Sequence, residues 1–115
     1  MSIFLGLCSN VGEKHKNLSL GCKLIEALPV VDLVKLSSIY ETTPMYNTNQ
    51  ATFLNMVVKI FTPCTPHELL IKVKDIETNL GRNIDNGHNL PRILDIDILA
   101  YGSEQVIDDN LTIPH

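Results

Sequence analysis

The sequence has 115 residues, a formal net charge of −4, and a composition of 44% apolar and 19% charged residues. This length suits one hydrophobic core, so we expect a single domain over residues 1–115. The acidic balance argues against binding to nucleic acid or to an anionic membrane surface. Three cysteines without close spacing predict neither a zinc motif nor a disulfide framework, and no stretch resembles a secretion signal or a membrane span. We therefore expect a cytoplasmic protein.

The first expected elements are a strand and a helix. Residues 3–8 (Ile-Phe-Leu-Gly-Leu-Cys) are typical of a strand that is buried on both faces. Residues 13–28 carry an apolar stripe at helical spacing, and Pro29 ends it. Ser9 and Asn10 lie between the two elements, where they either cap the helix or point polar groups at a ligand.

Two further strands are expected in the middle of the chain. Residues 30–40 and 53–62 are rich in β-branched and aliphatic side chains, and we expect them to pair antiparallel. The polar segment 41–52 between them is long for a hairpin, which is typical of a functional loop. Asn55 either reads the hydrogen-bonding edge of a heterocycle or is satisfied by the backbone around it.

A second helix follows these strands. Residues 65–68 (Thr-Pro-His-Glu) form a capping box, which predicts a helix that begins at Pro66 and stops at Gly81. Glu77 falls away from the apolar stripe of this helix and is expected to face solvent. His67 is expected to be a solvent-facing residue of the first turn.

The last predicted strand carries two acids. Within residues 91–99 (Pro-Arg-Ile-Leu-Asp-Ile-Asp-Ile-Leu), apolar and polar residues alternate from Leu94 to Ile98, so Asp95 and Asp97 share one face of a strand. Neighbouring carboxylates repel each other unless a cation lies between them, and Mg²⁺ is commonly held by one or two carboxylates while substrate phosphates complete its shell. Arg92 is suited to bind the phosphate oxygens. The alternative is an acidic edge strand that faces water.

The order strand, helix, strand, strand, helix, strand predicts an α+β fold of the ferredoxin-like βαββαβ type, with both helices on one face of an antiparallel sheet. We expect the helices to cover the side of the sheet formed by Leu94, Ile96, Ile98 and Ala100. Asp95 and Asp97 are then expected on the other face.

Six segments carry a familiar pattern along nearly the whole chain: residues 5–10 (Leu-Gly-Leu-Cys-Ser-Asn), 37–42 (Ser-Ser-Ile-Tyr-Glu-Thr), 53–55 (Phe-Leu-Asn), 76–82 (Ile-Glu-Thr-Asn-Leu-Gly-Arg), 91–99 and 111–115 (Leu-Thr-Ile-Pro-His). Together they resemble the 6-hydroxymethyl-7,8-dihydropterin pyrophosphokinases of folate biosynthesis, whose signature is Pro-Arg-x-x-Asp-x-Asp. The resemblance implies transfer of pyrophosphate from ATP to 6-hydroxymethyl-7,8-dihydropterin, release of AMP, and two Mg²⁺ ions. It also suggests other folate-pathway domains as partners.

The same resemblance implies roles for individual residues. The implied metal ligands are Asp95 and Asp97, and the implied catalytic residues are these two acids with Arg82 and Arg92. The residues implied to bind the nucleotide are Glu77, Arg82, Arg92, Ile98 and His115. The residues implied to bind the pterin are Thr42, Met45, Phe53 and Asn55.

The sequence departs from the family pattern in three places. Cys8 stands where the family has glycine, and residues 88–90 (His-Asn-Leu) stand where it usually has a basic and a small residue. Family members also continue past the position of His115, so we expect this C-terminally short chain to fold and bind Mg²⁺ and ATP but to turn over slowly. The alternative function is a catalytically weak or inactive ferredoxin-like binding or assembly module.

Overall fold

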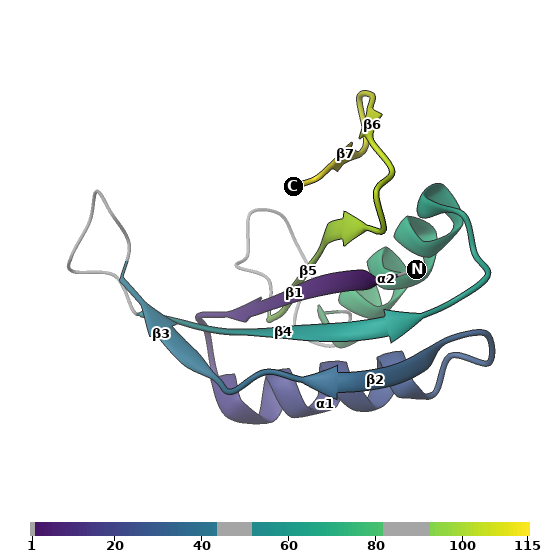
Figure 1. Ribbon diagram of the computed structural model, residues 1–115. Coiled ribbons are helices and arrows are strands. Elements are labelled where there is room, and N and C mark those ends of the chain that lie inside the picture. Colours follow the sequence, from purple (N-terminus) through teal and green to yellow (C-terminus); the bar gives the residue numbers. More distant parts are fainter. Residues whose placement is uncertain (1, 44–51, 82–92) are drawn as a thin grey trace.

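The computed structural model of the protein describes residues 2–43, 52–81 and 93–115 (Figure 1). The helices and strands are, in chain order, β1 (Ile3–Ser9), α1 (Lys14–Glu26), β2 (Asp32–Leu36), β3 (Tyr40–Thr42), β4 (Phe53–Phe61), α2 (Pro66–Gly81), β5 (Asp95–Tyr101), β6 (Val106–Ile107) and β7 (Thr112–Ile113).

The main sheet has the strand order β2-β4-β1-β5, with β3 also paired to β4, and every neighbouring pair is antiparallel. Helix α1 packs on β1 and β4, α2 packs on β5, and the two helices contact each other. The predicted α+β, ferredoxin-like arrangement is confirmed. The face of the sheet turned away from the helices is called the open face below.

The core lies between the sheet and the helices. Its members include Leu5 and Leu7 of β1, Leu18 of α1 and Val73 of α2. In β1 the buried residues alternate with half-buried ones, so the expectation of a strand buried on both faces is wrong. The reason is that both helices pack on the same side and leave the open face half-buried.

The strand expected over residues 30–40 is divided into β2 and β3. At the break, Ser37 takes over the pairing with β4, because its backbone N–H donates to the carbonyl of Val57 and its Oγ accepts from the N–H of Val57, both at 2.8 Å. A serine side chain thus replaces a backbone acceptor. The pattern of β-branched residues carries no signal for such a substitution.

At the junction of β1 and α1, Ser9 neither caps the helix nor points toward a ligand site, contrary to the two sequence-based interpretations. Its side chain is 1% exposed, donates to the carbonyl of Ile93 at 2.6 Å and accepts from Nδ2 of Asn17 at 3.1 Å. The N-cap residue of α1 is Glu13, which makes no side-chain capping bond. Ser9 therefore ties β1 to α1 and to the segment before β5.

The start of α2 is as expected. The N–H of Glu68 donates to Oγ1 of Thr65 at 3.2 Å, and the N–H of Thr65 donates to Oε1 of Glu68 at 2.8 Å. The bond from the N–H of Thr65 lowers the pKa of the Glu68 carboxyl, and the Thr65 side chain adds to this fall. The capping box therefore satisfies two groups at this helix end, and Pro66 begins the helix.

A bulge in β5 changes the pairing with β1. Ile98 pairs with Leu5 and Ala100 pairs with Phe4, so Leu99 is an extra residue. Ala100 therefore lies beside Phe4, and both residues are half-buried. The expectation that Ala100 continues the buried face of Ile98 is wrong. The carbonyl of Leu99 accepts a hydrogen bond from the N–H of His115 at 2.9 Å.

Residues 103–115 follow β5 and are called the β6–β7 arm. Strands β6 and β7 pair with each other in a separate two-stranded sheet, drawn in yellow at the top of Figure 1. The buried side chains of Leu111 and Ile113 anchor the arm in the core. Within the described ranges, no helix is both long enough and apolar enough to cross a membrane.

Candidate active site

Strand pairing brings three polar side chains into one row on the open face. Cys8 of β1 lies opposite Asn55 of β4 on one side and Asp95 of β5 on the other. Gly6 lies opposite Asp97 in the same way, so both acids share the open face, as the alternation of the strand predicted. A row across three strands is not visible in any one segment of the sequence, because it depends on the register between strands.

The residues implied to bind the pterin gather at one end of this row. Thr42 of β3 pairs with Phe53, and Nδ2 of Asn55 donates to Oγ1 of Thr42 at 3.0 Å. Asn55 also approaches the carbonyl of Tyr40 at 3.5 Å. Thr42, Phe53 and Asn55 are therefore neighbours, and both readings of the Asn55 amide remain compatible with these contacts.

Glu77 differs from its expected position. Its side chain is 6% exposed, so the expectation that it faces solvent is wrong. Its Oε2 accepts the backbone N–H of Ile96 at 2.5 Å, and its Oε1 lies 3.2 Å from Nζ of Lys74. Strand β5 is at the edge of the main sheet, so alternate N–H groups point away from β1 and need another acceptor. Glu77 supplies that acceptor between Asp95 and Asp97.

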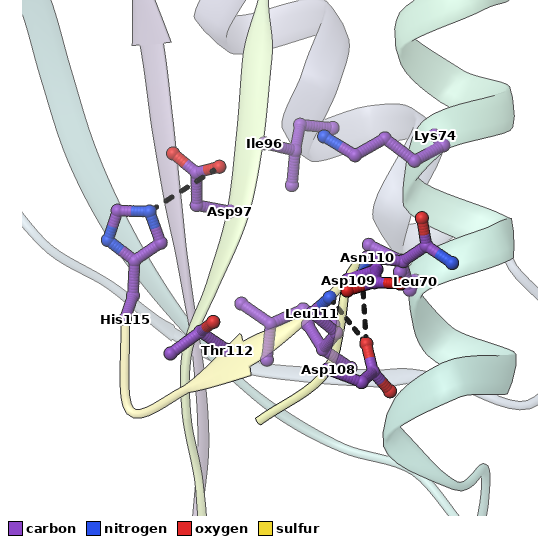
Figure 2. A pocket seen from close by; sticks show the side chains of 11 residues that line it. Leu70, Lys74, Ile96, Asp97, Asp108, Asp109, Asn110, Leu111, Thr112 and His115 are labelled. Carbon is purple, nitrogen blue, oxygen red and sulfur yellow. Dashed lines mark hydrogen bonds and ion pairs between the residues drawn. The ribbon is translucent and has the colours of Figure 1, made fainter. Parts of the chain in front are cut away.

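A cavity of about 270 Å³, the arm pocket, lies between α2, β5 and the β6–β7 arm. Its lining consists of Leu70 and Lys74 of α2, residues 96–98 of β5, and residues 108–112 with His115 of the arm. Figure 2 shows the imidazole of His115 turned toward Asp97, with Nε2 of His115 at 3.9 Å from Oδ1 of Asp97. Asp97 thus belongs both to the open face and to the arm pocket.

The Cys8 thiol sits close to both acids. Burial raises the pKa of the thiol to about 11, and the carboxylates of Asp95 and then Asp97 add to the rise. The thiol is therefore neutral near pH 7, and a neutral thiol is a poor ligand for a metal ion.

The acidic side chains of the described residues fit a Mg²⁺ site. The open face offers two adjacent carboxylates, Asp95 and Asp97. In residues 2–43, 52–81 and 93–115 there is no group of three or more His, Cys, Asp or Glu side chains that could hold a metal ion. Two carboxylates without a full protein cage fit Mg²⁺, which keeps positions for water and for substrate phosphates.

Three of the predicted site residues, Met45, Arg82 and Arg92, lie outside the described residues, as do residues 88–90. The structure adds residues that the sequence reasoning missed, among them Leu70, Lys74 and Thr112. The spacing of Lys74 three residues before Glu77 is a signal that could have found it, because such residues are neighbours on a helix.

Comparison with known proteins matches the sequence to a family. Residues 4–115 match the family described as 7,8-dihydro-6-hydroxymethylpterin-pyrophosphokinase (HPPK). The chain is 42% identical over 112 residues to 2-amino-4-hydroxy-6-hydroxymethyldihydropteridine pyrophosphokinase of Methylorubrum extorquens, covering 97% of the chain and 70% of the relative. It is 39% identical over 115 residues to the Aquifex aeolicus protein of the same name, covering 99% of the chain and 69% of the relative.

A longer relative also matches nearly the whole chain. The folate synthesis bifunctional protein of Arabidopsis thaliana is 38% identical over 113 residues, which are 98% of this chain and 23% of that protein. The predicted resemblance is confirmed, and the chain belongs to the 7,8-dihydro-6-hydroxymethylpterin-pyrophosphokinase family.

Proposed function

We propose that this chain transfers the pyrophosphoryl group of ATP to the hydroxymethyl oxygen of 6-hydroxymethyl-7,8-dihydropterin. The observation that carries the proposal is the position of Asp97. It shares the open face with the row of Asn55, Cys8 and Asp95, and it also lines the arm pocket. One carboxylate therefore lies between a surface suited to a heterocycle and a cavity suited to a nucleotide.

The arm pocket is the proposed site of the adenosine part of ATP. Leu70, Ile98 and Leu111 offer apolar surface for a flat base, and Lys74 and His115 offer polar groups. Such a cavity, apolar with a few polar side chains, is typical of small-molecule sites. The triphosphate would extend from the pocket toward Asp97. Arg82, Arg92 and Glu77 are proposed to bind the nucleotide with these residues.

Asp95 and Asp97 are proposed to hold Mg²⁺, and we propose two ions. When bound, Mg²⁺ would neutralise the triphosphate and orient it for in-line displacement. The hydroxymethyl oxygen attacks the β-phosphorus, the bond from that phosphorus to the α–β bridging oxygen breaks, AMP leaves, and the hydroxyl proton passes to water. Because phosphoryl transfer needs little covalent help, the work of Asp95, Asp97, Arg82 and Arg92 is positioning and charge compensation.

The pterin is proposed to lie over the other end of the open face. Phe53 can stack on its flat ring, and Asn55 and Thr42 can hydrogen-bond its edge. Met45 is proposed to belong to the same site. The proposed unit is one domain over residues 1–115, which in bifunctional relatives stands beside other folate-pathway domains.

The test is AMP release from ATP, Mg²⁺ and 6-hydroxymethyl-7,8-dihydropterin by the full chain, with omission of each component as a control. The matched variants are Asp97→Asn and Asp75→Asn, because Asp75 is an exposed acid on α2 outside the site. We expect Asp97→Asn to lower the rate by about a hundredfold or more and Asp75→Asn to leave it unchanged. Absence of AMP from the unmodified chain, or equal rates for the two variants, would contradict the proposal.

A further inference from the structure

A polar contact joins the first turn of α2 to the β6–β7 arm. Nε2 of His67 lies 2.6 Å from Oδ2 of Asp108. Because a carboxylate can only accept, Nε2 carries the proton in this bond. As expected for a solvent-facing residue of the first turn, the side chain of His67 is 54% exposed, but it has a defined partner 41 residues away in the sequence.

Asp108 also organises the turn of the arm. Its Oδ1 accepts the backbone N–H groups of Asn110 and Leu111, each at 2.9 Å, and its own N–H donates to the carbonyl of Leu111 at 3.0 Å. Figure 2 shows both bonds to the carboxylate. The bond from His67 and the bonds from these N–H groups lower the pKa of the Asp108 carboxyl. The Oδ1 atom of Asp108 thus stabilises the turn, and its Oδ2 atom contacts His67 of α2.

The contact spans two walls of the arm pocket. Leu70, one helical turn after His67, lines the pocket from α2, and residues 108–112 line it from the arm. Strands β6 and β7 pair only with each other in the described part of the chain. The arm is held at its base by the buried side chains of Leu111 and Ile113 and by the bond from the N–H of His115 to Leu99. The His67–Asp108 contact joins the turn of the arm directly to α2 and so limits how far these two walls can separate.

We propose that His67 and Asp108 are positioning residues that set the width of the arm pocket and thereby the affinity for ATP. The identity of the ligand rests on the proposed function, whereas the mechanical role rests on the contacts above. Neither residue touches the reacting atoms. Breaking the contact is expected to weaken nucleotide binding and to leave the reaction rate at saturating ATP unchanged.

The expected effect is modest because both partners are partly in water. The side chain of Asp108 is 42% exposed, and ion pairs at such exposure are screened by solvent. We therefore expect a two- to fivefold change in ATP affinity, roughly the range seen for exposed pairs.

The experiment compares His67→Ala, His67→Gln and the control His15→Ala, since His15 is an exposed histidine of α1. Binding of the non-hydrolysable analogue α,β-methylene-ATP with Mg²⁺ is measured by calorimetry, kcat by AMP release, and amide exchange of Asn110 and Leu111 by NMR without nucleotide. His67→Ala should bind the analogue about two- to fivefold more weakly, exchange these amides faster and keep its kcat. His67→Gln should recover most of the affinity, because its amide can still donate to Asp108.

The outcomes separate this inference from the proposed function. If the unmodified chain produces AMP and His67→Ala binds the analogue as tightly as His15→Ala, the inference is wrong and the proposed function stands. Faster exchange without loss of affinity also overturns it, because the arm would then move without affecting the pocket. If the unmodified chain produces no AMP, the proposed function fails, and a loss of analogue affinity in His67→Ala alone would still support the positioning role.

Discussion

The carboxylate of Glu77 accepts the backbone N–H of Ile96 at 2.5 Å and thereby joins helix α2 to the strand that carries Asp95 and Asp97. The N–H of Ile96 lies between the two acids, so the bond fixes the peptide on which their spacing depends. Lys74 balances the charge of Glu77 from the same helix. About one turn of α2 thus supports the acidic strand from the side opposite to β1.

The first prediction concerns this support. Glu77→Ala leaves the N–H of Ile96 without its side-chain acceptor, which should lower the free energy of unfolding by about 1–3 kcal/mol. Glu77→Gln retains an acceptor oxygen and should lose much less. Urea denaturation measures both, with Asp75→Ala as the control for removal of an acid from α2. Equal unfolding free energies for Glu77→Ala and Asp75→Ala would show that the bond to Ile96 makes no net contribution to stability.

The second prediction concerns Asn55. If its amide reads the pterin edge, Asn55→Leu should weaken pterin binding by roughly ten- to a hundredfold, because the hydrogen-bonding groups of the ligand lose their partner. Thr42→Val removes the acceptor that orients the amide, since Nδ2 of Asn55 lies 3.0 Å from Oγ1 of Thr42, and should have a smaller effect. Pterin titration followed by fluorescence measures both. Unchanged pterin affinity in Asn55→Leu would favour the reading of Asn55 as a satisfied strand residue.

The third prediction concerns the Cys8 thiol. Because its pKa is raised from 9.0 to about 11, little thiolate exists at pH 8, and iodoacetamide should label Cys8 slowly. Labelling should accelerate as the pH rises toward 11 and should be faster in Asp97→Asn, which lacks one of the charges that raise the pKa. Mass spectrometry of the labelled peptide measures the rate. Rapid labelling at pH 8 would contradict the assignment.

The same shift makes a prediction for stability. A raised pKa in the folded state means that folding favours the protonated thiol, so the contribution is fully present below pH 9 and is lost as the pH rises toward 11. The difference in unfolding free energy between the unmodified chain and Cys8→Ser should therefore shrink over this interval. A difference that stays constant from pH 8 to pH 11 would argue against the shift.

The fifth prediction concerns Gly21 of α1. A Cβ at this position would lie 2.6 Å from Cδ2 of Leu94 and 3.1 Å from Cδ2 of Leu7. Gly→Ala inside a helix gains about 1 kcal/mol of helix propensity, but an overlap in a packed core costs about 1–3 kcal/mol. We expect Gly21→Ala to be destabilised by roughly 1 kcal/mol, because the overlap outweighs the propensity. Ser19→Ala, at an exposed position of the same helix, should be slightly stabilised.

The predictions that the sequence supported best depend on local chemistry. The capping box of residues 65–68, the facing of Asp95 and Asp97, and the order of helices and strands each follow from side chains that are close in the sequence. The fold class, predicted from the order of the elements, is confirmed, and so is the family, which six segments along the sequence predicted by resemblance. The roles of the individual site residues stay predictions.

The expectations that failed concern contacts between distant segments. Ser9 bonds to Ile93, Glu77 bonds to Ile96, and Ser37 substitutes for a backbone acceptor opposite Val57. In each case a polar side chain satisfies a backbone group that the arrangement of strands leaves unpaired. Which groups are left unpaired is decided by strand order and register, and neither is encoded in the local pattern.

The bulge at Leu99 has a consequence for changes in the length of β5. The position numbers of Asp95, Asp97 and Tyr101 differ by even amounts, so in a regular strand all three side chains would face the same side. The extra residue lets Tyr101 pair with Ile3 and stay 3% exposed, while the acids remain on the open face. Deleting Leu99 would either turn the tyrosine outward or carry the two aspartates into the core. The strand therefore cannot lose or gain one residue between Asp97 and Tyr101 without exchanging an acidic surface for a hydrophobic one.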